Sequence, residues 1–365
     1  MRLTEVALRV PKRDTLQNAV ALLLSVVICL AVAEVFLRTT APPQRYLDER
    51  TDSYWRALRS VSPRALSEEG DLALHPELGW RMKPYFERDG VHHNSLGFRG
   101  KREYAPNRRG PRVLAIGESF TYGLGVADES TFSAILERIA GIEVLNAGVN
   151  GYGVDQASLM WEIEGRRFHP SSVILGYYVD DFFRNELSLR DGPKPRFVYD
   201  PATQRYRLEQ LAGRNTAASE ASSQSILEGS LKIPQAMGWV VRRARSRFCW
   251  LEVEGLTRRA RLSEYLLRRL HSSVTQSGAR LLVVVIGHSY DGLPEHLWIE
   301  DSIVQACRSN GIECLNLSAA RREAGAPPLY GENGHFSEQG HRFAAERIAA
   351  ALGLGRSERR MAPAY

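Results

Sequence analysis

Val113-Leu114-Ala115-Ile116-Gly117-Glu118-Ser119-Phe120-Thr121-Tyr122-Gly123 has the pattern of a strand that ends in a turn, and the predicted fold is built around it. Its first four residues are apolar, which is typical of a buried strand. Gly117 then breaks the run and Ser119 follows, so the strand is predicted to end in a turn that presents the serine hydroxyl. Open α/β sheets carry their chemistry at the carboxyl ends of their strands. Ser119 is therefore a candidate nucleophile, and a helix cap is the other interpretation of this residue.

A second polar stretch, Glu332-Asn333-Gly334-His335, precedes a strongly periodic helix that Ser337 is predicted to cap. A carboxylate three residues before a histidine can supply a general base together with the group that orients it. A loop histidine bonded to the backbone is the structural alternative for His335. The serine at a strand end and this histidine together favour nucleophilic catalysis.

Four sequence blocks resemble those of the SGNH (GDSL-type) hydrolase family and occur in the family's order across residues 75 to 354. They are, in chain order, Gly117–Gly123, Asn146-Ala147-Gly148, Tyr178-Val179-Asp180-Asp181 and Glu332–His335. The upstream stretches around Trp80 and Asn94–Gly100 are similar to those of membrane-anchored bacterial members. The resemblance implies an α/β fold and an activity on ester bonds.

The resemblance also implies a role for each matching residue. Ser119 would be the nucleophile, His335 the general base, and Glu332, at the family's aspartate position, the carboxylate that orients the histidine. The backbone N–H groups of Ser119 and Gly148 would donate hydrogen bonds to the oxyanion. Asn333 lies nearer to the histidine in sequence and could orient the ring only as a neutral group.

One position departs from the family's pattern. The third oxyanion donor is normally an asparagine amide, and Asp180 stands at the matching position. An ionised carboxylate cannot donate a hydrogen bond and would repel the developing charge, and losing one donor costs about 2.7–4 kcal/mol in the barrier. Either Asp180 turns away and Asn150 or Asn185 replaces it, or the enzyme is slow or inactive.

Five apolar runs alternate with helical patterns, which predicts a flavodoxin-like, doubly wound parallel sheet of five strands with helices on both faces. The predicted strands are 112–116, 143–147, 172–179, 280–286 and 312–317. Residues 183–254 lack strand periodicity and are interpreted as an insertion. His288 follows the fourth strand and is a second-choice base, whereas His341 on the last helix is expected to serve packing.

Ala19–Leu37 is apolar except for Ser25 and Glu34. About 20 apolar residues span a bilayer as a helix, so this run is just long enough. Lys12 and Arg13 precede it, which predicts a cytoplasmic amino terminus and an extracytoplasmic remainder. A cleaved signal peptide and a buried core helix are the alternatives to an uncleaved anchor.

The composition is that of an ordinary globular chain, with 365 residues, a net charge of +6, 44% hydrophobic and 25% charged residues. The positive charge comes almost wholly from arginine and accompanies no nucleic-acid-binding motif, so nucleic acid is not an expected partner. No metal or other cofactor is expected, since His92 and His93 lack neighbours at ligand spacing. The expected organisation is a cytoplasmic end (1–18), an anchor (19–38), a stalk with a loop-rich segment (39–110), a hydrolase-like domain (111–354) and a tail (355–365).

The sequence thus predicts an extracytoplasmic, single-pass membrane-anchored serine esterase. It would hydrolyse or transfer an O-acyl group on a carbohydrate or lipid through an acyl-enzyme. The alternative is a catalytically impaired subunit of similar fold that binds a glycan or a membrane partner. Asp180 favours this alternative, and the presence of Ser119 and His335 favours the enzyme.

Overall fold

The computed structural model describes residues 69–108, 110–188, 190, 192–211, 250–288 and 294–354, with a few positions between 17 and 29. Most of the predicted anchor, the stalk before residue 69, most of the insertion and the tail lie outside the described residues. In the part of the chain that is described, no helix is both long and apolar enough to span a bilayer. The description below concerns the compact unit formed by residues 58–217 and 253–365.

A five-stranded parallel sheet forms the centre of this unit. Its strands are β5 (Arg112–Ile116), β6 (Glu143–Asn146), β7 (Ser172–Tyr178), β10 (Arg280–Ile286) and β11 (Glu313–Asn316). They lie in the order β11-β10-β7-β5-β6, so the second strand along the chain occupies one edge and the first lies beside the third. This is the flavodoxin-like order, and the five predicted strands are confirmed to within two residues at each end.

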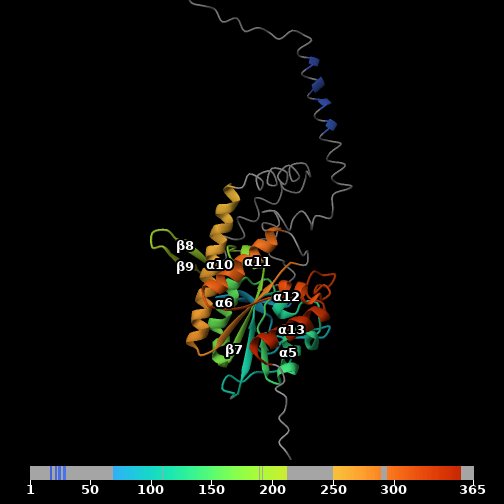
Figure 1. The fold of residues 1–365 in the computed structure, drawn as a ribbon, viewed down its shortest axis with the longest axis vertical. Helices are drawn as coiled ribbons and strands as arrows, with labels where there is room; N and C mark the ends of the chain where they lie inside the picture. The colour runs from blue at the N-terminus through green and yellow to red at the C-terminus, as the bar shows by residue number, and fades with distance from the viewer. Residues whose placement is uncertain are drawn as a thin grey trace, which may run out of the picture. The chain divides into compact units, whose positions relative to one another are not determined.

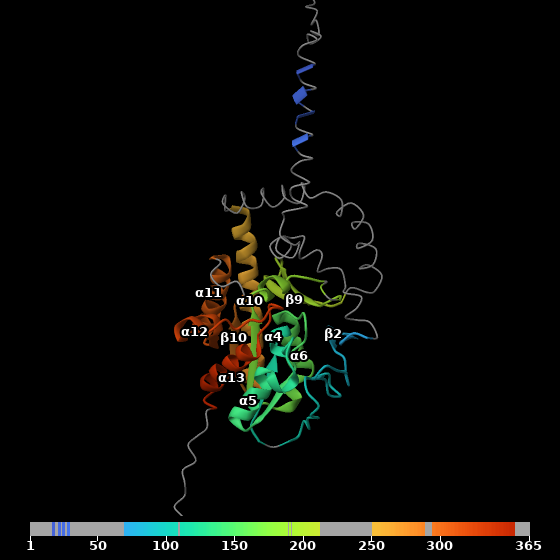
Figure 2. The same ribbon diagram turned by 90° about the vertical axis from the view of Figure 1, so that its right-hand side faces the viewer.

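Helices cover both faces of the sheet (Figure 1). The helical elements of the unit are α4 (Ser119–Tyr122), η1 (Asp128–Ser130), α5 (Phe132–Ala140), α6 (Val154–Ile163), η2 (Gly165–Phe168), α7 (Asp181–Arg184), α10 (Trp250–Gln276), α11 (Pro294–Ser309), α12 (Leu317–Ala324) and α13 (Glu338–Leu352). The helices α5 and α13 pack together on one face, and α6 and α10 lie on the other (Figures 1 and 2). Right-handed crossover connections produce this division. Ser337 caps α13, as its sequence position predicts.

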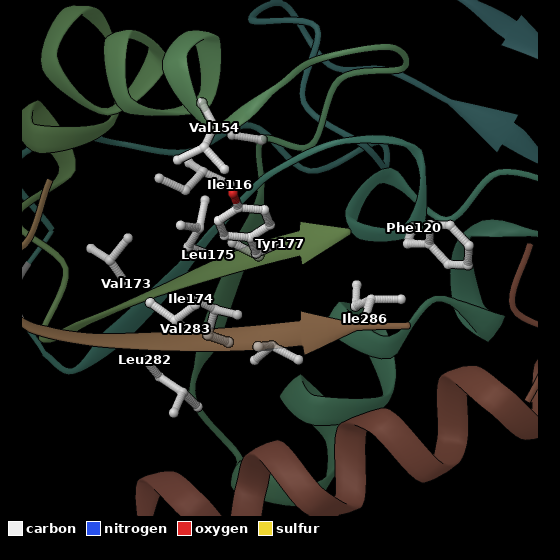
Figure 3. Packing of buried hydrophobic residues seen from close by; sticks show 14 of the residues in the cluster. Ile116, Phe120, Val154, Val173, Ile174, Leu175, Tyr177, Leu282, Val283 and Ile286 are labelled. Carbon is white, nitrogen blue, oxygen red and sulfur yellow. The ribbon is translucent and has the colours of Figure 1, made fainter. Parts of the chain in front are cut away.

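The sheet is buried on both sides, which explains why its strands read as continuous apolar runs. In β7 the side chains of Val173, Leu175 and Tyr177 point to the face of α6, and Ile174 points to the opposite face (Figure 3). All four are fully buried. This packing fixes the register of β7 between β5 and β10. Because β5 pairs with β7, with Ile116 opposite Leu175, the same packing sets the position at which β5 ends.

The segment upstream of the sheet belongs to the same compact unit. It contains two short hairpins, β1 (Leu72–His75) with β2 (Gly79–Met82), and β3 (Glu87–Arg88) with β4 (Val91–His92). Its apolar side chains Trp80 and Phe98 are buried in the common core. The described part of the predicted stalk segment therefore extends the hydrolase-like domain upstream of residue 111.

The insertion contains two strands, where none was predicted. β8 (Arg196–Asp200) and β9 (Arg205–Glu209) form an antiparallel hairpin. Each strand is only five residues long, and β8 carries Phe197-Val198-Tyr199 in a row without alternation, so the periodic signal is weak. Phe197 on β8 packs against Tyr265 of α10, with ring centroids 5.7 Å apart, and this contact joins the hairpin to the domain.

Candidate active site

The candidate nucleophile lies where β5 turns into α4. Gly117 has a φ of +148°, and a Cβ there would come within 2.4 Å of Thr121 Oγ1 and 2.8 Å of the Gly176 carbonyl oxygen. Only glycine fits this turn without displacing the backbone. Glu118 caps α4 by accepting a hydrogen bond from the Phe120 N–H. The chain therefore presents Ser119 at the carboxyl edge of the sheet, as the sequence predicts.

The structure brings Ser119 and His335 together. Ser119 Oγ lies 2.9 Å from His335 Nε2, across 216 residues of sequence. The histidine stands in the loop before α13, where Asn333 Oδ1 accepts a hydrogen bond from the His335 backbone N–H at 3.0 Å. The Phe120 ring lies 4.9 Å from the imidazole between centroids and limits its rotation. The dyad has the geometry that a general base needs to take the serine proton.

Burial lowers the pKa of His335 below its usual value, and the Arg184 and Arg190 cations lower it further. The Asn333 backbone carbonyl raises the pKa of His335, because its hydrogen bond with the ring favours the charged form. A lowered pKa keeps the imidazole neutral at more acidic pH. His335 is thus available as a base over a wider pH range than an exposed histidine would be.

The structure does not bring Glu332 to the imidazole. His335 Nδ1 faces the Asn333 backbone carbonyl oxygen at 3.2 Å. The Glu332 side chain is exposed and forms no hydrogen bond or ion pair with any described residue. A neutral carbonyl can fix the tautomer with hydrogen on Nδ1, but it supplies no negative charge to stabilise the imidazolium.

Glu332→Gln is therefore expected to change kcat/KM for an aryl ester by less than about threefold, since the exposed carboxylate makes no contact that the variant removes. Removing a carboxylate that orients the histidine would instead cost about 10⁴-fold in kcat. Steady-state kinetics of the two proteins decide between these values. A loss of hundreds-fold would mean that Glu332 moves onto Nδ1 when substrate binds.

The predicted oxyanion donors differ in how they are used. The Ser119 backbone N–H is the first of α4 and donates to no described residue. The Gly148 N–H donates to Asn146 Oδ1 at 3.1 Å, and the Asn150 side-chain amide donates to Asp71 Oδ2 at 3.1 Å. Asp180 is half-buried at the start of α7, on the same edge of the sheet. The Asn185 side-chain amide, the other predicted replacement donor, is buried and has no partner among the described residues. Two of the predicted donors are thus unpaired there, and the other two already have partners.

Sequence reasoning missed the buried charges beside the dyad. Glu118 is fully buried, and its Oε2 lies 2.9 Å from Ser119 Oγ. Arg184 is also buried and pairs with Asp181 at 3.0 Å. The available signal was that three acidic residues and one arginine lie at the ends of two strands that the fold places side by side.

The upstream segment holds the end of the nucleophile helix through Arg99. Its guanidinium donates to the carbonyl oxygens of Gly123 (3.2 Å) and Val126 (2.6 Å), pairs with Asp128 at 2.5 Å and lies over the Tyr122 ring. The Arg99 side chain is 2% exposed. Arg99 thus neutralises the carbonyl end of α4 and fixes the loop that follows it.

Arg99→Met is expected to reduce the free energy of unfolding by about 3 kcal/mol or more, because buried carbonyl oxygens lose a donor and Asp128 loses its arginine partner and keeps only His92. It should also lower kcat about tenfold through displacement of α4. Arg102→Met is the matched control, since Arg102 is 53% exposed and pairs with Glu137 near the surface. Urea unfolding and steady-state kinetics test both values, and equal effects of the two variants would contradict the role given to Arg99.

The other histidines occupy different places. His288 stacks on Tyr178 with ring centroids 6.0 Å apart, at the carboxyl edge of the sheet. His341 is fully buried, and its Nδ1 accepts the Phe132 N–H at 3.1 Å, so it serves packing as predicted. His92 bonds to Asp128 and Glu87. Among the described residues, no group of three histidine, cysteine, aspartate or glutamate side chains is arranged to hold a metal.

No protein family and no curated protein matches the chain by sequence. Solved structures of similar fold include a protein from Desulfitobacterium hafniense assigned to the G-D-S-L lipolytic family (13% identity, TM-score 0.40, 67% of this chain and 100% of that one). An acetylxylan esterase from Geobacillus stearothermophilus matches at 16% identity and a TM-score of 0.41, over 68% of this chain and 97% of that one. An α/β hydrolase from the metagenome of Lake Arreo matches at 13% identity and a TM-score of 0.41, over 68% and 98%.

Proposed function

We propose that this chain is a serine esterase of the SGNH (GDSL) type that forms an acyl-enzyme on Ser119. One observation carries the proposal: Ser119 Oγ lies 2.9 Å from His335 Nε2 at the carboxyl edge of a parallel sheet. A serine hydroxyl in contact with a neutral imidazole is the arrangement that acyl transfer requires. The order of the sequence blocks, from Gly117 to His335, supports the same assignment.

In this mechanism His335 Nε2 takes the hydroxyl proton as Ser119 Oγ bonds to the ester carbonyl carbon. The carbonyl oxygen becomes an oxyanion, which the Ser119 N–H can stabilise. The bond to the leaving alcohol then breaks, and the imidazolium gives the proton to the alcohol oxygen. Water or a second alcohol reverses these steps on the acyl-enzyme, which gives hydrolysis or transfer of the acyl group.

We further propose that the enzyme acts outside the cytoplasm, attached to a membrane by the apolar run Ala19–Leu37, on an acylated carbohydrate or lipid. The charge distribution before this run supports the orientation. A periplasmic or exterior location would place the site next to surface glycans and lipids. The acceptor decides between hydrolysis and transfer, and both use the same acyl-enzyme.

Reporter fusions after residue 60 test the orientation. An export-dependent reporter is expected to be active and a cytoplasm-dependent reporter inactive, because Lys12 and Arg13 keep the amino terminus inside. Deletion of Ala19–Leu37 should reverse both signals. A cytoplasm-dependent reporter that is active on the full-length segment would contradict the topology.

A non-catalytic subunit is the second candidate function, and specific contacts favour it. Glu118 contacts the nucleophile, Gly148 has its N–H bonded to Asn146, and Asp180 stands at the third donor position. Hydrolysis of a short-chain aryl ester by the purified protein decides between the two functions. Turnover that depends on Ser119 supports the enzyme, and glycan binding without turnover supports the subunit.

A further inference from the structure

The Ser119 hydroxyl has two hydrogen-bond acceptors and one hydrogen. Ser119 Oγ lies 2.9 Å from Glu118 Oε2 and 2.9 Å from His335 Nε2. An ionised carboxylate is acceptor-only, and a neutral imidazole with hydrogen on Nδ1 is an acceptor at Nε2. The Asn333 carbonyl oxygen, 3.2 Å from Nδ1, requires that tautomer. Ionised Glu118 and neutral His335 therefore compete for the same hydrogen.

We propose that Glu118 is a positioning residue whose protonation state decides which partner receives the Ser119 hydroxyl. Ionised Glu118 accepts the hydrogen and keeps it from His335, so the serine is not activated. Neutral Glu118 is a weaker acceptor and can itself donate to Ser119 Oγ, which directs the hydroxyl to His335. This inference rests on the proposed serine esterase function.

The surroundings of Glu118 allow it to be neutral within an accessible pH range. It is fully buried, and its Oε1 has no partner among the described residues. Three further groups act on it: Arg184 and Asp181 from α7 and the Tyr178 hydroxyl from the end of β7. Burial raises the pKa of Glu118, and the Arg184 cation together with the hydrogen bonds from Phe120 and Ser119 opposes that rise.

The sign of the pH dependence follows from the two groups. Activity requires neutral His335, which exists above its lowered pKa, and neutral Glu118, which exists below its raised pKa. The kcat/KM profile should be a bell whose acid limb belongs to His335 and whose alkaline limb belongs to Glu118. At pH values above the pKa of Glu118, kcat/KM should fall about tenfold for each pH unit.

The test is the pH profile of kcat/KM for an aryl ester with the full-length wild type and Glu118→Gln. Glutamine keeps the cap, because its amide oxygen can replace Oε2 as the acceptor of the Phe120 N–H. It is neutral at every pH and is a weaker acceptor of the Ser119 hydroxyl than a carboxylate. The alkaline limb should disappear, so that the variant exceeds the wild type by about tenfold for each pH unit above that limb. Glu129→Gln makes the same change at an exposed side chain and is the matched control. It should keep the limb, because the carboxylate responsible for the limb is Glu118.

Glu118→Asp guards against a glutamine variant that does not fold. Aspartate is a strong helix cap, and its side chain is shorter by one methylene, so the carboxylate lies farther from Ser119 Oγ. The loss of kcat/KM at high pH should therefore be at least about tenfold smaller than in the wild type. A limb that persists unchanged in Glu118→Asp or Glu118→Gln would overturn the proposal, as would folded variants that lose activity equally at every pH. If wild-type protein neither hydrolyses the ester nor reacts at Ser119, the proposed function fails instead, and the two failures are distinct.

Discussion

Ser119→Ala and His335→Ala are each expected to lower kcat for short-chain aryl esters by about 10³-fold or more. The first removes the atom that bonds to the carbonyl carbon, and the second removes the base 2.9 Å away from it. Both should keep the wild-type fold, because Ser119 stands at a strand end and His335 in a loop, where neither supports the core. Circular dichroism and urea unfolding check the fold alongside the kinetics.

Two controls separate the dyad from its neighbours. Ser130→Ala changes a serine whose hydroxyl bonds to Glu338 near the surface, and it should leave kcat within about twofold. His288→Ala changes the second-choice base, which stacks on Tyr178 with ring centroids 6.0 Å apart. Wild-type activity in the Ser119 variant would show that another group is the nucleophile, and loss in the His288 variant alone would reassign the base.

Asp180→Asn is expected to raise kcat/KM by up to about 100-fold at the pH optimum. The carboxylate stands where the family that the sequence resembles has an amide donor. Of the predicted donors, the Gly148 N–H and the Asn150 amide bond elsewhere. The Ser119 N–H and the buried Asn185 side-chain amide lack a partner among the described residues. A neutral amide would add a donor and remove a repelling charge.

The kinetics of Asp180→Asn must be compared with those of Asp181→Asn. Asp181 pairs with Arg184 in the interior, so its substitution should mainly reduce stability. A higher rate only in the Asp180 variant supports its position at the oxyanion. An unchanged or lower rate would mean that Asp180 is a structural group, and the barrier must then be lowered by other donors.

The central sheet could be predicted because its determinants are local. The apolar runs of β5, β7 and β10 carry their own strand signal, and a glycine directly follows β5 and β10. The place of Ser119 at a strand end follows from Gly117 and the run before it. The hairpin β8–β9 was missed because its strands are short and rich in arginine and tyrosine, so that its stability depends on the contact of Phe197 with Tyr265.

The contacts within the site could be predicted only in part. The pairing of Ser119 with His335 could be predicted from the order of the sequence blocks and from the residue types in them. Glu332 was predicted as the orienting group from its sequence spacing to His335 alone. Loop geometry instead turns the Asn333 carbonyl toward Nδ1. The place of Glu118 beside the hydroxyl depends on the backbone of the turn after β5, which no side-chain pattern specifies. Arg99 reaches α4 from a separate hairpin region, and such tertiary contacts leave no periodic signal.

Reaction of the purified full-length protein with a fluorophosphonate ester, followed by peptide mass spectrometry, shows directly whether Ser119 is the nucleophile. We expect one adduct, located on Ser119, that forms more slowly as the pH falls through the pKa of His335. It should be absent from Ser119→Ala. An adduct on another residue, or none at Ser119 in folded protein that hydrolyses esters, would contradict the role of Ser119 as nucleophile.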